Sequence, residues 1–104
     1  MKKEIAIKLR EKAEEISRQY SNPEREFNPN HETFTVARIQ PLSEMVACVT
    51  FLKSSGKKSL ALFYYLNSSN GYWQYFFPTE SHLYGLQKFP RLLQQLEEEN
   101  FKQN

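Results

Sequence analysis

The chain has 104 residues, of which 39% are hydrophobic, 14% aromatic and 25% charged. This length and composition are typical of one compact domain with its own core, so we predict a single domain over residues 1–104 without long disordered regions. The net charge of +2, from 14 basic and 12 acidic residues, is too balanced to indicate a nucleic-acid partner by itself.

The first residues and the cysteine content bear on the cellular compartment. Charges run through MKKEIAIKLREKAEE, where a secretory signal peptide needs an apolar stretch, and Cys48 is the only cysteine, so no internal disulfide can form. The longest apolar runs, such as SLALFYYL, are far shorter than a membrane span. We therefore expect a cytoplasmic protein without membrane association.

The first predicted element is an amphipathic helix over about residues 2–20. Its apolar residues recur at helical spacing, with Lys, Arg and Glu at the other positions. The apolar positions are Ile5, Leu9, Ala13, Ile16 and Tyr20. A connector over residues 21–32 follows, in which two prolines and three asparagines favour turns and Phe27 is the one obvious anchor.

A four-stranded sheet is predicted over residues 33–77. The strands are TFTVARIQ, MVACVTFLK, SLALFYYL and YWQYFFP, which are rich in β-branched and aromatic residues. Pro41 ends the first strand, and the short turns SSGKK and NSSNG join the last three. Strands joined in this way form an antiparallel meander.

A helical region is predicted over residues 81–102, because a turn near residues 81–87 precedes a helix beginning at about Pro90. Leu92, Leu93 and Leu96 give that helix an apolar stripe. The fold class is therefore α+β, with an N-terminal and a C-terminal helix packed on one face of the sheet in two layers.

Both faces of this sheet carry aromatic residues, and two helices cover only one face. Alternation groups Phe63 with Tyr65 on the third strand, and Tyr72 with Phe76 on the last strand. We predict that these four form the exposed interaction surface if the helices cover the opposite residues, although the two faces can be exchanged. The residues under the helices would then be Leu60, Leu62, Trp73 and Tyr75.

Three covers are open for the second face. The connector can fold back over it through Phe27, which would make the aromatics ordinary core; otherwise a second copy of the chain, or a ligand or macromolecule, covers it. We expect a small non-enzymatic binding module that acts by protein–protein interaction, with a homodimer through the aromatic face as one form.

A second hypothesis is binding of single-stranded RNA or DNA. Bases would stack on the same rings while Arg38, Lys53, Lys57 and Lys58 neutralise phosphates. Acidic residues interleave with the basic ones on the first helix, and SSGKK is more typical of a solvated hairpin tip, so this pattern is weak.

A third hypothesis places a small ligand or catalytic site at Thr79, Glu80, Ser81 and His82, where a strand end meets a helix start. The simpler interpretation is that these residues cap the following helical turn.

Other chemistry has little support in the sequence. Cys48 could pair with His31 or His82 as nucleophile and base, but its place in an apolar strand favours a buried residue. The sequence has neither the spacing of a zinc site nor a glycine-rich phosphate loop, so we predict no metal and no cofactor.

Overall fold

The described residues form one helix and four strands. The computed structural model describes residues 1–24, 31–67 and 70–79, together with the isolated positions 82, 85, 87, 90, 91 and 94. The elements are α1 (Lys3–Tyr20), β1 (Phe34–Pro41), β2 (Val46–Lys53), β3 (Lys58–Leu66) and β4 (Tyr72–Phe76). The strands pair antiparallel in the order β1-β2-β3-β4, which confirms the predicted meander.

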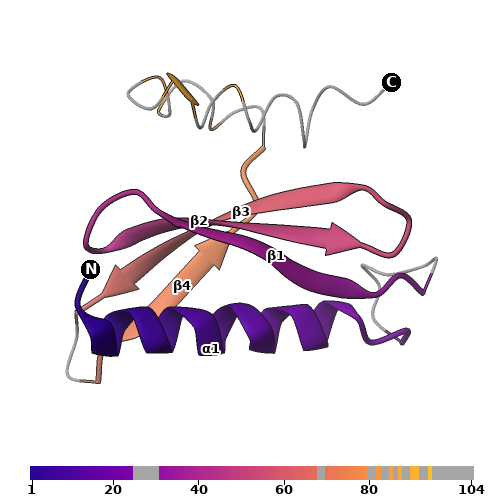
Figure 1. Ribbon diagram of the computed structural model, residues 1–104, viewed down its shortest axis with the longest axis horizontal. Helices are drawn as coiled ribbons and strands as arrows, with labels where there is room; N and C mark the ends of the chain where they lie inside the picture. Colours follow the sequence, from indigo (N-terminus) through magenta and orange to yellow (C-terminus); the bar gives the residue numbers. More distant parts are fainter. Residues whose placement is uncertain are drawn as a thin grey trace.

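The N-terminal helix is also confirmed, and α1 packs on one face of the sheet (Figure 1). Within the continuous described ranges α1 is the only helix. The helical region predicted over residues 81–102 lies outside the described residues apart from the isolated positions, so the C-terminal helix stays a prediction. Phe27 also lies outside them, and the connector as a cover for the second face likewise stays a prediction.

The face that α1 covers, called the first face below, holds the larger core. Leu9, Ala13 and Ile16 of α1 are buried there, at the spacing that the sequence indicates. The sheet residues of this core alternate along the strands and are Phe34, Ala47, Val49, Phe51, Ala61, Phe63 and Trp73. Complete burial of a side chain such as Phe63 contributes roughly 1.5–3 kcal/mol.

The opposite face, called the second face, has a smaller buried cluster. Cys48, Leu60 and Leu62 form it, with Leu42 and Phe76 packed against them. Thr50 lies opposite Leu60 and is buried as well. The centre of the second face is therefore buried and mainly apolar, as in a sheet with two packed faces.

Two polar contacts fasten α1 to β4. The indole N–H of Trp73 donates to the carbonyl of Ile5 at 3.0 Å, and the hydroxyl oxygens of Tyr20 and Tyr75 are 3.4 Å apart. Trp73 is only 2% exposed, so its N–H needs an acceptor within the protein. These contacts hold the beginning of α1 near the start of β4, and the end of α1 near the last residues of β4.

Ser21 joins the end of α1 to the start of β1. Its hydroxyl donates to the carbonyl of Ser17 at 2.7 Å and accepts the backbone N–H of Phe34 at 2.8 Å. The hydroxyl thus caps the last turn of the helix and fixes the first residue of the strand. The two ends of the connector are thereby held together.

We predict that Ser21→Ala lowers the free energy of unfolding by about 1–2 kcal/mol, because it removes the acceptor of a part-buried backbone N–H. Urea unfolding followed by Trp73 fluorescence measures the change. Ser55→Ala, in the exposed β2–β3 turn, is the matched control and should be neutral. An equal effect of both substitutions would contradict the role assigned to Ser21.

Candidate protein-interaction surface

The four aromatic residues predicted to form one surface lie on both faces of the sheet. Leu66 lies directly opposite Tyr72 in the β3–β4 pairing, and directly opposite residues of an antiparallel pair share a face. Even-numbered residues of both strands therefore share the second face. Tyr72 and Phe76 lie there, whereas Phe63 and Tyr65 lie on the first face under α1, so the predicted grouping is wrong.

The reason for this correction is the register of the hairpin. Alternation within a strand shows which of its residues share a face, but the turn decides which set on the next strand joins them. Residues 67–71 separate Leu66 from Tyr72, and this length sets the two residues opposite each other. Counting the turn could have paired Phe63 with Tyr75 and Tyr65 with Trp73 from the sequence.

Burial follows the corrected faces. Phe63 is fully buried and stacks against Tyr75, with the ring centroids 5.5 Å apart. Tyr65 is half-buried against Trp73. Tyr72, by contrast, is 46% exposed and is among the most exposed large hydrophobic residues of the described chain.

An exposed apolar patch lies at one end of the second face. It consists of Tyr64, Leu66 and Tyr72, which are 38%, 37% and 46% exposed, and we call it the Tyr72 patch. Leu66 and Tyr72 are cross-strand partners, and Tyr64 lies two residues along β3 on the same face. Tyr64 and Leu66 were not among the predicted site residues, because only the register brings them beside Tyr72.

The two edges of the sheet differ in protection. At the β1 edge, the strand has a bulge between Val36 and Arg38, an exposed Arg38 and a terminal Pro41. Bulges, charges and prolines are the features that keep an edge strand from pairing with another chain. The β4 sequence YWQYF contains none of them. The β4 edge is therefore the less protected of the two.

The hydrogen-bonding direction of β4 follows from its neighbour. The N–H of Tyr65 donates to the carbonyl of Met45 at 2.8 Å, so the odd-numbered residues of β3 bond toward β2 and the even-numbered ones toward β4. In β4 the even-numbered residues consequently bond back to β3. The backbone groups of Trp73 point to the outer side of the sheet.

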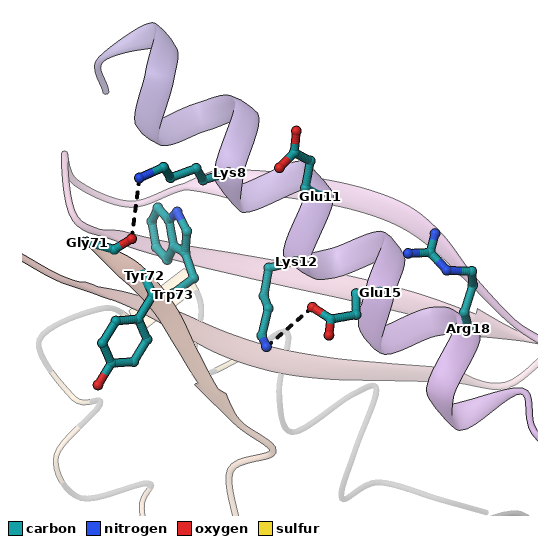
Figure 2. Close-up of a pocket in the computed structure, with 8 residues that line it drawn as sticks. All are labelled: Lys8, Glu11, Lys12, Glu15, Arg18, Gly71, Tyr72 and Trp73. Carbon is teal, nitrogen blue, oxygen red and sulfur yellow. Dashed lines mark hydrogen bonds and ion pairs between the residues drawn. The ribbon is translucent and has the colours of Figure 1, made fainter.

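A groove of about 570 Å³ lies between the flank of α1 and the start of β4 (Figure 2). Its lining residues are Lys8, Glu11, Lys12, Glu15, Arg18, Gly71, Tyr72 and Trp73. Lys8 reaches across to the carbonyls of Asn70 and Gly71 at 3.3 and 3.4 Å, and Lys12 pairs with Glu15 at 3.4 Å. The α1 side of the groove thus alternates in sign and carries no large net charge.

The predicted nucleic-acid contacts are distributed over the sheet. Lys53 lies over the ring of Phe34 on the first face, 5.7 Å from its centroid. Arg38 pairs with Thr50 on the second face, and Lys58 starts β3, whereas the Tyr72 patch lies where β3 ends. Lys57 lies in the turn before β3. The structure does not gather these cations around the exposed rings, and nucleic-acid binding stays a prediction.

The predicted ligand site is described only in part. Thr79 donates its backbone N–H to Nδ1 of His82 at 3.0 Å, and the His82 N–H donates to the Thr79 carbonyl at 2.9 Å. The His82 ring lies 5.0 Å from that of Phe76. Glu80 and Ser81 lie outside the described residues. His82 thus closes a local turn, and a ligand site here stays a prediction.

The histidines and Cys48 do not form a visible catalytic or metal site. Cys48 is 1% exposed, lies directly opposite Leu62 and clusters with Leu60 and Leu62. His31 is exposed just before β1. Within residues 1–24, 31–67, 70–79 and the isolated positions, no group of three or more His, Cys, Asp or Glu side chains could hold a metal ion.

Comparisons of this chain with protein-family models, curated proteins and solved structures found no match. In the described part of the chain, no helix is long and apolar enough to cross a membrane. The geometry of the β4 edge, the Tyr72 patch and the groove is therefore the basis for assigning a function.

We predict that Gly71→Ala destabilises the protein by roughly 1–2 kcal/mol or more, because Gly71 has a φ of 52° and an added Cβ would meet the hydroxyl of Tyr65. Thermal unfolding of Gly71→Ala in the wild-type and Tyr65→Phe backgrounds measures the contribution of this contact. The substitution should cost less where the hydroxyl is absent. An equal cost in both backgrounds would show that the contact is unimportant.

We also predict that Cys48 reacts with a thiol reagent on the order of 100-fold more slowly in the folded protein than in denaturant, because only opening of the sheet exposes it. The absorbance released by a chromogenic disulfide reagent measures the rate. A variant carrying Cys48→Ala and Ser55→Cys, with its thiol in the exposed turn, should react rapidly. Rapid reaction of native Cys48 would revive the hypothesis of a thiol nucleophile.

Proposed function

We propose that this protein is a small non-enzymatic binding module that acts by protein–protein interaction through the β4 edge. The observation that carries the proposal is an outer strand without a guarding residue. Such an edge accepts an extended segment of another chain by adding a strand to the sheet. This replaces the four-residue aromatic face predicted from the sequence.

Two neighbouring features support the same surface. The Tyr72 patch borders the edge on the second face, and the groove borders it on the first face. An added strand would direct alternate side chains to each of them. Backbone pairing would then contribute affinity, and the patch would contribute selectivity for an apolar side chain.

Among the described residues beside the β4 edge, the lack of a concentrated positive charge favours this proposal over nucleic-acid binding. Affinity for a nucleic acid comes largely from cations that neutralise phosphates. Beside the β4 edge, Lys12 is paired with Glu15 and Lys8 contacts backbone carbonyls. The surface near the exposed rings therefore suits a peptide strand better than a polyanion.

A display library of extended peptides tests the proposal, with the protein immobilised at low density. We expect recovered sequences that alternate apolar and polar residues and bind with dissociation constants of about micromolar strength. Tyr72→Lys, which places a guarding lysine on the edge, should weaken binding by about tenfold or more.

The matched control is Ile7→Lys, which introduces the same charge at an exposed hydrophobic residue of α1 that does not line the groove. It should leave binding unchanged. Selection of no peptide, or selection of peptides that Tyr72→Lys does not affect, would count against strand addition at β4.

A further inference from the structure

We infer that the occupant of the β4 edge is a second copy of this chain, which pairs its own β4 antiparallel across a two-fold axis at Gln74. This inference rests on the proposed function, because it uses the same edge. It adds the identity of the partner and the register of the seam. The two sheets would then join into one continuous sheet, with both copies of α1 on its first face.

The amino-acid order of β4 is self-complementary about Gln74. With Gln74 opposite Gln74 of the second copy, Tyr72 lies opposite Phe76 of the second copy, and Trp73 lies opposite Tyr75 of the second copy. Aromatic pairs directly opposite one another are among the favourable cross-strand pairs, and the exposed Tyr72 can form such a pair with Phe76 of the second copy. Trp73 is already buried under α1, so it contributes to the seam through its backbone. The half-exposed amide of Gln74 both donates and accepts hydrogen bonds, so two of them can pair at the axis.

The backbone direction agrees with this register. Hydrogen-bonded pairs across an antiparallel seam must be residues whose backbone groups point outward on both strands. The even-numbered residues of β4 bond back to β3, so the odd-numbered residues must meet at the seam. An axis centred on Gln74 places the odd-numbered residues of one β4 opposite the odd-numbered residues of the other, as this hydrogen bonding requires.

A two-fold axis centred on either neighbouring residue of β4 fits less well. An axis at Trp73 would bring Gly71 into the seam, but its φ of 52° is not that of an extended strand. An axis at Tyr75 would bring in Phe77, which lies beyond the end of β4. Only the axis at Gln74 pairs all five residues of the strand and none outside it.

The charges beside the edge also suit a second copy. The α1 flank of the groove presents Lys8, Glu11, Lys12, Glu15 and Arg18, with alternating sign. Two such flanks facing each other bring both signs together, whereas a flank of one sign would repel its copy. Burial of Tyr72 in the seam would also remove the largest exposed apolar area of the Tyr72 patch from water.

The seam is small. Five residues a side fall short of the roughly 1,600 Å² that a stable interface typically buries, so we expect a reversible dimer with a dissociation constant on the order of micromolar or weaker. Sedimentation velocity over a range of protein concentrations should show a shift from monomer to dimer.

A charge exchange at the axis tests the register. Gln74→Glu and Gln74→Lys each place two like charges opposite one another, so each should raise the dissociation constant by about tenfold or more. An equimolar mixture of the two variants should restore dimers as a heterodimer, because the axis then holds one charge of each sign. The same substitutions at Gln40, which lies on the other edge strand, should leave the dimer unchanged.

The outcomes separate this inference from the proposed function. A wild-type protein that stays monomeric at every concentration overturns the second copy as occupant, while peptide selection sensitive to Tyr72→Lys would still support strand addition. A dimer that Gln74 charges do not weaken, or that the mixture does not restore, overturns the β4 seam. Failure of both the peptide selection and the charge exchange removes the β4 edge as a binding surface.

Discussion

The fold depends on the register between β3 and β4. Because Leu66 lies opposite Tyr72, Trp73 and Tyr75 share the first face with Phe63 and extend the core under α1. A slip of one residue would turn every side chain of β4 to the other face. The indole of Trp73 would then lose the carbonyl of Ile5, and the hydroxyl of Tyr75 would lose that of Tyr20, so both polar attachments of α1 to the strand would be lost.

The path of α1 explains why the β4 edge borders a groove. The helix begins beside Trp73 and ends at Tyr20. The ring centroid of Tyr20 lies 5.7 Å from that of Phe34 of β1 and 5.5 Å from that of Phe77. It therefore lies across the first face, with its end beside both the start of β1 and the last residues of β4 (Figure 1). Small helix–sheet domains bury one stripe of the helix, and its polar flank remains at the margin of the sheet.

The elements that could be predicted are those whose signal is local. The helical spacing from Ile5 to Tyr20 and the β-branched and aromatic runs of the strands each depend on a few neighbouring residues. The distribution of Phe63, Tyr65, Tyr72 and Phe76 over the two faces of the sheet could not be obtained in that way. It required the alternation of two strands together with the length of the turn between them. Neither pattern alone decides which residues of β3 and β4 share a face of the sheet.

The remaining features depend on the tertiary structure. The position of β4 at an edge follows from the sheet order, and the sequence YWQYF alone is equally suited to a central strand. Ser21 belongs to a segment rich in turn-forming residues, so its hydroxyl had no distinguishing pattern there. Its role follows only from the approach of Phe34 to the end of α1.

The attachment made by Ser21 also bears on how the protein could be engineered. Because its hydroxyl bonds hold the end of α1 against the start of β1, the intervening chain has its two ends fixed independently of its length. Each doubling of a flexible loop costs only about 0.6 kcal/mol in closure entropy. A tag or tether inserted between Glu24 and His31 would anchor the molecule on the β1 side, and β4, at the opposite edge of the sheet, would stay accessible to a partner.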